Sequence, residues 1–113
     1  MIRRSLPAAL ALLFPLAAPA AASPSWTFCV ASALGSKEIW ITSLFPAEAN
    51  RERLEQELKA LLERQGHPRI VAQCPQPTED KVSALNAQTT AEEFNRKLGS
   101  VLHGVPAREF PPR

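Results

Sequence analysis

Residues 25–45 consist of two runs rich in β-branched and aromatic side chains that flank Gly35 and Ser36. Such a pattern, with a two-residue turn signal between the runs, is typical of a β-hairpin. Centring the turn on these two residues predicts three cross-strand pairs: Val30 with Ile41, Phe28 with Ser43, and Trp26 with Phe45.

The hairpin has two unequal faces in this register. The apolar face, which we expect to form the core, carries Trp26, Phe28, Val30, Ile39, Ile41 and Phe45. The second face is smaller and more polar, and it carries Thr27, Cys29, Ala31, Trp40, Thr42 and Leu44. A shift of one residue would mix the two sets, so the pattern favours this pairing.

An amphipathic helix is expected next. Its leucines recur at the i, i+4, i+7 and i+8 spacing of a single helix face, at Leu54, Leu58, Leu61 and Leu62. The helix begins at Asn50 or at the preceding Pro46, and Gly66 ends it. Residues 69–74 then form a short apolar strand, which Pro75 ends because proline has no N–H to donate to a sheet.

The second helical region is less regular. Thr78, Glu79 and Asp80 indicate its beginning, with a capping hydroxyl and with acidic residues that the helix dipole favours. Two pairs of apolar residues lie about 120° apart around a continuous helix, Val82 with Leu85 and Phe94 with Leu98. This predicts two short helices, or one helix with a break near residues 88–90. A strand over residues 100–105 and a loose, proline-rich tail over residues 106–113 follow.

The element order is ββαβα(β), which predicts a small α+β domain over residues 23–105. We expect a two-layer sandwich whose helices pack on the sheet face that carries Trp26, Phe28 and Val30.

The first 22 residues have the composition of a cleaved signal peptide. Arg3 and Arg4 form a basic start, residues 6–16 are an apolar core, and small residues allow cleavage between Ala20 and Ser23. The apolar core is too short for a permanent anchor, which takes about 20 residues. We therefore expect export to the periplasm or the medium, by the general route or, given the paired arginines, by the twin-arginine route.

Charge excludes two classes of partner. The chain has 13 basic and 11 acidic residues, but Arg3 and Arg4 leave with the signal peptide, so that the two kinds balance. A neutral, mixed surface has no electrostatic footprint for nucleic acid or for an anionic membrane.

The two cysteines, Cys29 and Cys74, are expected to form a disulfide. A small exported domain buries only about 60% of its unfolded surface and meets an oxidising compartment. A catalytic pair of Cys74 with His67 is excluded, because seven extended residues separate them by roughly 23 Å. The sequence does not place His103, so it does not exclude a pair with that histidine. A zinc site that adds both histidines, His67 and His103, has the wrong spacing, and the C-x-x-C of a redox dithiol is missing.

Catalytic patterns are likewise missing: the sequence has no G-x-S-x-G, P-loop or H-E-x-x-H. The nearest approach to an acid–base pair is Asp80 with Glu79 or Glu38. Two of these acids sit in a water-exposed helix start, where nothing would raise a carboxyl pKa. We therefore expect no enzyme, no cofactor and no metal.

Recognition remains as the function. Trp40 projects from the second hairpin face among Thr27, Thr42 and Leu44, and an exposed indole among small polar residues suits a sugar ring or a protein. The alternative is that the second helical region, the tail or a second copy of the chain covers this face.

One resemblance bears on the choice of ligand. The strand–helix–strand unit of residues 45–71 is similar to half of a SPOR-type peptidoglycan-binding repeat, without a second half of the same pattern. We expect an exported accessory or inhibitor-like domain that binds a protein. The alternative is a cell-wall or glycan-binding module that uses the Trp40 face.

Overall fold

The computed structural model describes residues 25–47 and 50–112. Within these residues it contains β1 (Trp26–Thr27), β2 (Val30–Ala33), β3 (Glu38–Thr42), β4 (Phe45–Pro46), α2 (Arg51–Arg64), β5 (Ile70–Gln73), α3 (Lys81–Lys97) and β6 (Val101–Val105). The predicted α+β class is confirmed. The predicted signal peptide, residues 1–22, lies outside the described residues. Neither described helix has the length and apolar character needed to cross a bilayer.

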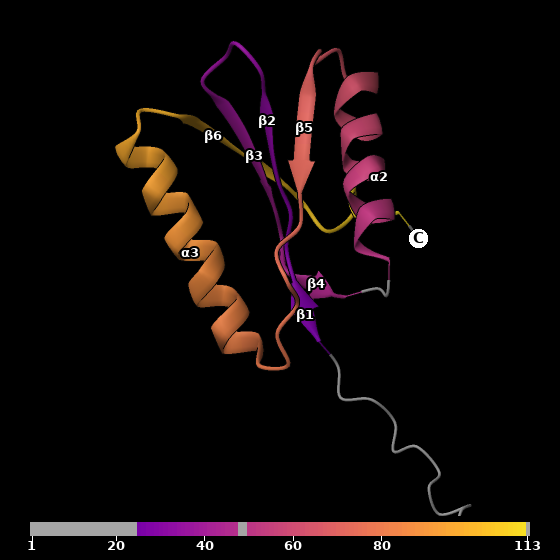
Figure 1. Cartoon of the computed structure of the whole chain (residues 1–113), viewed down its shortest axis with the longest axis vertical. Helices are drawn as coiled ribbons and strands as arrows, with labels where there is room; N and C mark the ends of the chain where they lie inside the picture. The colour runs from indigo at the N-terminus through magenta and orange to yellow at the C-terminus, as the bar shows by residue number, and fades with distance from the viewer. Residues whose placement is uncertain (1–24, 48–49, 113) are drawn as a thin grey trace, which may run out of the picture.

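Four strands form the main sheet, in the order β5-β2-β3-β6. β2 is antiparallel to both β3 and β5, whereas β6 runs parallel to β3. β1 and β4 form a separate two-stranded extension at one end of the molecule (Figure 1). The strand expected over residues 100–105 is therefore present, as the edge strand β6.

The predicted hairpin register is confirmed between β2 and β3 but is wrong between β1 and β4. Val30 pairs with Ile41, as predicted. Trp26, however, pairs with Pro46 rather than with Phe45. One extra residue just before β4 accounts for this shift, which is the effect of a β-bulge. The shift turns Phe45 onto the second hairpin face.

The main core lies on the hairpin face that we expected to be the lesser one. Cys29, Ala31 and Trp40 belong to it, together with the buried leucines of α2. The expectation of a core on the Trp26, Phe28 and Val30 face is therefore wrong. α2 packs beside β5, and its leucines share one core cluster with the small side chains of β2, at the density that protein interiors require.

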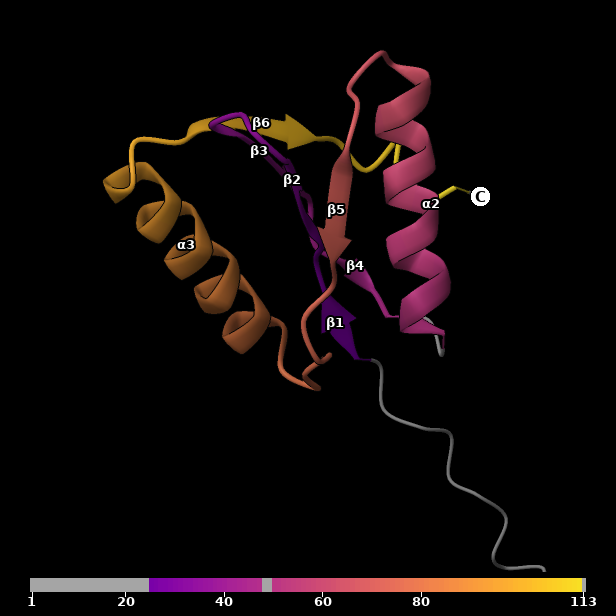
Figure 2. The same cartoon turned by 45° about the horizontal axis from the view of Figure 1, so that its top comes forward.

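The two helices cover opposite faces of the sheet. Figure 2 shows the sheet between α2 and α3. Phe28 and Ile41, on the face away from α2, are also buried, at 3% and 5% exposure. The structure thus has three layers, and the expected two-layer packing of both helices on one face is wrong.

α3 is one continuous helix of 17 residues, so the predicted break near residues 88–90 is absent from it. Only Ala84 of this helix is buried. The two apolar pairs that suggested a break do not both have to face the sheet, because both stay exposed. The helix can therefore remain straight.

Asp80 caps the N-terminus of α3, in place of the hydroxyl expected from Thr78. Its carboxylate accepts a hydrogen bond from the Ser83 hydroxyl and another from the Val82 N–H, both at 2.9 Å. These two hydrogen bonds, that of Ser83 foremost, hold the pKa of Asp80 below its ordinary value of 3.8.

We expect this cap to be lost in acid. Because the pKa of Asp80 is lowered in the folded state, the cap stabilises α3 fully above the ordinary aspartate pKa and is lost as the pH falls through the lowered value. The Val82 amide resonance in an NMR titration measures this. Asparagine caps as well as aspartate but does not titrate, so Asp80→Asn should abolish the change. A transition that persists in Asp80→Asn would contradict the assignment.

The segment after β6 is anchored at Phe110. This side chain is 1% exposed and meets Phe45 edge-on, with ring centroids 5.7 Å apart. The Phe110 N–H donates to the carbonyl of Pro106, which folds the segment back in a turn. The predictions of a loose tail and of a domain that ends at residue 105 are therefore wrong, because Phe110 belongs to the core.

Candidate functional site

The two cysteines form the predicted disulfide. Cys29 directly precedes β2 and Cys74 directly follows β5. Because these strands pair antiparallel, the two Cα atoms lie only 4.1 Å apart. Both residues are buried. The chain has no other cysteine, so no thiol is left for nucleophilic, redox or zinc chemistry.

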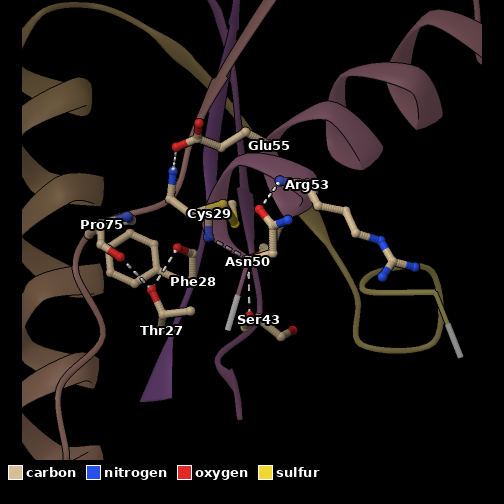
Figure 3. Close-up of a disulfide and its surroundings, with 10 residues drawn as sticks. Thr27, Phe28, Cys29, Ser43, Asn50, Arg53, Glu55 and Pro75 are labelled. Atoms are coloured by element: carbon tan, nitrogen blue, oxygen red, sulfur yellow. Dashed lines mark hydrogen bonds between the residues drawn. A yellow bond between two sulfur atoms is a disulfide. The ribbon is translucent and has the colours of Figure 1, made fainter. Parts of the chain in front are cut away.

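Side chains from three parts of the fold satisfy the backbone around the disulfide (Figure 3). The Cys29 N–H donates to the Thr42 hydroxyl and the Cys74 N–H donates to the Glu55 carboxylate, both at 2.9 Å. The Thr27 hydroxyl donates to the carbonyl of Pro75 at 3.0 Å. Two residues of the predicted binding face, Thr27 and Thr42, therefore form hydrogen bonds with the backbone around the disulfide.

The predicted recognition face is covered. Trp40 is 5% exposed, and Thr27 and Thr42 are 3% and 1% exposed, whereas Leu44 is half-buried. The expectation of an exposed indole is wrong, and the glycan hypothesis loses the feature on which it depended. The face is covered, as the alternative proposed, but by the first predicted helix, α2, together with Phe110 of the tail, and not by the second helical region.

Two histidines flank Trp40. Its ring centroid lies 4.7 Å from that of His67, which is tilted, and 5.3 Å from that of His103, which is stacked. His103 is in this position because β6 pairs with β3 in a register that places it opposite Trp40. The sequence contained no signal for this contact, because it did not indicate which strand β6 would join.

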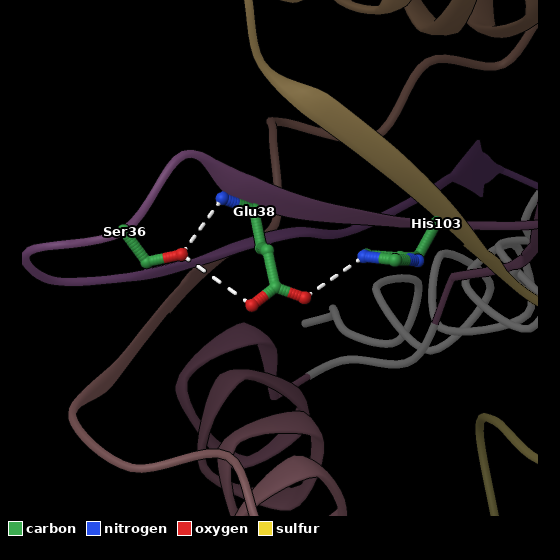
Figure 4. A network of polar contacts seen from close by, with 3 residues as sticks. All are labelled: Ser36, Glu38 and His103. Atoms are coloured by element: carbon green, nitrogen blue, oxygen red, sulfur yellow. Dashed lines mark hydrogen bonds and ion pairs between the residues drawn. The ribbon is translucent and has the colours of Figure 1, made fainter.

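Ser36, Glu38 and His103 form a polar group near the turn end of the hairpin (Figure 4). The Glu38 carboxylate lies 3.0 Å from His103 Nε2, and the Ser36 hydroxyl donates to its other oxygen at 3.5 Å. Activation of a serine requires the imidazole to contact the hydroxyl. Here the carboxylate stands between them, so this order does not generate a nucleophile.

The remaining candidates for chemistry stay apart. The Asp80 carboxylate is engaged with the Ser83 hydroxyl and the Val82 N–H, and the Glu38 carboxylate with Ser36 and His103. Within residues 25–47 and 50–112, no group of three His, Cys, Asp or Glu side chains could hold a metal ion.

Four large exposed apolar side chains lie on α3 and its C-cap residue, as two pairs on different sides of the helix. We call them the α3 surface: Val82 at 63%, Leu85 at 47%, Phe94 at 60% and Leu98 at 63% exposure. The helix reaches the sheet through Gln88, whose Nε2 donates to the carbonyl of Thr42 at 2.7 Å. A hollow of about 360 Å³ lies between Gln88, Glu92 and the strands β3 and β6. α3 is therefore tethered to the sheet while much of its apolar surface faces solvent.

Comparisons with known proteins add no further assignment to this geometry. No protein family, no curated protein and no solved structure matches the chain.

Proposed function

We propose that this protein is an exported, non-catalytic domain that binds a protein partner through the α3 surface, in the periplasm or outside the cell. A single observation carries the proposal: α3 exposes four large apolar side chains and buries only Ala84. Helices gain most of their stability from packing of an apolar face. Contiguous exposed apolar groups mark interaction sites, and Phe94 and Leu98, four residues apart on one side of the helix, form such a group.

Two further features support this proposal. The Cys29–Cys74 bond agrees with export, because disulfides form and persist in oxidising compartments. The arrangement of Ser36, Glu38 and His103 separates the hydroxyl from the imidazole, and both cysteines are consumed in the disulfide. An accessory or inhibitor-like role, which needs a surface rather than a reactive group, agrees with both features.

Site-specific cross-linking in the organism that makes the protein tests this proposal. A photo-reactive phenylalanine analogue at position 94 should give a discrete adduct with another polypeptide in the exported fraction. The same analogue at Arg64, exposed at the end of α2, is the matched control and should give none. Adducts only with further copies of this chain, or an equal yield from both positions, would contradict a partner at α3.

Substitution of the same surface gives the second arm of the test. Changing Leu98→Gln, on the same side of α3 as position 94, should abolish the adduct formed there, with or without Leu85→Gln on the other side. Because both leucines are exposed, each change should alter the free energy of unfolding by less than about 0.5 kcal/mol. A denaturant titration checks this, so that loss of binding is not confused with loss of the fold.

A further inference from the structure

β5 forms one edge of the main sheet, and its hydrogen-bonding phase is fixed. The Leu34 N–H donates to the carbonyl of Arg69 at 3.0 Å. In an antiparallel ladder, hydrogen-bonded pairs alternate with non-hydrogen-bonded pairs. The backbone groups of Val71 and Gln73 therefore point toward β2, while those of Ile70 and Ala72 point away from it, to the open edge.

Cys74 confirms this phase independently. It is two residues beyond Ala72, and its N–H donates to Glu55 of α2 rather than to β2. Its Cα lies 4.1 Å from that of Cys29, the short separation of a non-hydrogen-bonded pair. At two successive outward-facing positions of β5, Ile70 and Ala72, the backbone N–H and carbonyl groups thus remain available to pair with an added strand.

A groove runs along this edge between β5 and α2. One hollow, of about 310 Å³, is lined by Glu52, Glu55, Gln56 and Lys59 of α2 and by Ile70, Val71 and Ala72 of β5. A second hollow, of about 350 Å³, is also lined by Glu55 and continues past Gln73 and Cys74 to Pro75. Because both hollows are lined by Glu55, they lie next to each other, and we call them together the β5–α2 groove.

The charge of the groove selects its occupant. Lys59 is 3.7 Å from Glu63, which compensates its charge. Arg51, which lines the second hollow, donates to the neutral Gln76 at 2.9 Å and keeps its positive charge. Within the described residues, Glu52 and Glu55 form no ion pair. With Lys59 paired, the α2 wall carries the carboxylates of Glu52 and Glu55 against the guanidinium of Arg51, an excess of one negative charge.

We propose that the β5–α2 groove binds an extended segment of another polypeptide, carrying lysine or arginine, as a strand added to β5. The added backbone pairs with Ile70 and Ala72, which is how exposed sheet edges recruit peptides. Its basic side chains lie beside Glu52 and Glu55. This site is separate from the α3 surface and does not depend on it.

Hydrogen exchange followed by NMR tests the added strand directly. The probe is a blocked hexapeptide of alternating lysine and valine, and its glutamate–valine counterpart is the control. Saturation with the lysine peptide should slow exchange of the Ile70 and Ala72 amides by roughly tenfold or more. The Val71 and Gln73 amides, which already face β2, should not change. No slowing, or equal slowing by the glutamate peptide, would overturn the proposal.

Variants separate the backbone from the charge. Ala72→Pro removes one outward N–H without removing a bond to β2, and it should abolish peptide binding. Val101→Thr, exposed on β6 at the opposite edge of the sheet, should leave binding unchanged. Glu52→Gln and Glu55→Gln should each weaken it by roughly two- to fivefold, as exposed ion pairs do. In the second of these variants the new side-chain amide carbonyl can still accept from the Cys74 N–H.

If Ala72→Pro fails to fold, the two glutamine variants still test the proposal, because they leave the backbone unchanged. Affinity unchanged in both glutamine variants would overturn the charge selection. Protection of Ile70 and Ala72 that grows with protein concentration alone would show that the edge pairs with a second copy, and it would also overturn the proposal. Neither result bears on the cross-link at position 94, so the two proposals fail independently.

Discussion

Removing the Cys29–Cys74 disulfide is expected to lower the free energy of unfolding by about 4 kcal/mol. The bond closes a loop over a sequence separation of 45 residues, and the chain-entropy account assigns that much stabilisation to such a loop. Small domains have total stabilities of about 5–15 kcal/mol, so the loss is a large fraction of the whole. Guanidinium unfolding of oxidised and reduced protein measures it, and the midpoint temperature should fall by roughly 15–30 °C.

The double variant Cys29→Ala with Cys74→Ala is the control for this prediction. Its unfolding should resemble that of the reduced protein and should not respond to a reductant. The protein recovered from its own host should resist thiol alkylation under denaturing conditions. Equal stability of the oxidised and reduced forms would show that the fold does not depend on the bond.

Phe110→Ala is expected to have a comparable effect, about 3–5 kcal/mol, although the residue lies near the chain end. The side chain is 1% exposed and sits in the main core, and truncation of a buried aromatic loses both its transfer free energy and its packing contacts. Chemical denaturation of the purified variant gives the value directly.

Two comparisons show whether packing causes the effect. Glu109→Ala changes the exposed neighbour of Phe110 and should alter stability by less than about 0.5 kcal/mol. A double-mutant cycle with Phe45→Ala should reveal a coupling of about 0.5–1.5 kcal/mol between the two edge-on rings. A small effect of Phe110→Ala, matching that of Glu109→Ala, would mean that the segment after β6 is not docked in solution.

Local patterns in the sequence were sufficient for most elements. The leucine spacing of α2 predicted its buried face, and Asn50 caps it as expected, since its side chain accepts from the Arg53 N–H at 3.0 Å. The pairing of Val30 with Ile41 followed from the alternation of side chains around the turn. Such features depend on residues a few positions apart, whose geometry is set by the chain itself.

The candidate sites were less predictable. Trp40 was predicted to be exposed because the polar neighbours on its face suggested contact with solvent. In the structure these threonines instead form hydrogen bonds with backbone groups around the disulfide. The α3 surface was visible as two apolar pairs, but the pattern was interpreted as a break in the helix. The groove along β5 had no sequence signature, because nothing in residues 70–73 indicates that they form an edge.

The sequence by itself determined the α+β class, the position of both helices, the hairpin register near the turn and the pairing of the two cysteines. These follow from periodicity, capping residues, turn chemistry and the count of two thiols. Only the tertiary structure decided which sheet face became the core, where β6 paired, that Phe110 completes the core, and which surfaces remain open. The reason is physical. A face with small side chains and one with large side chains can both be buried, and the choice depends on how closely a helix distant in sequence can approach each of them.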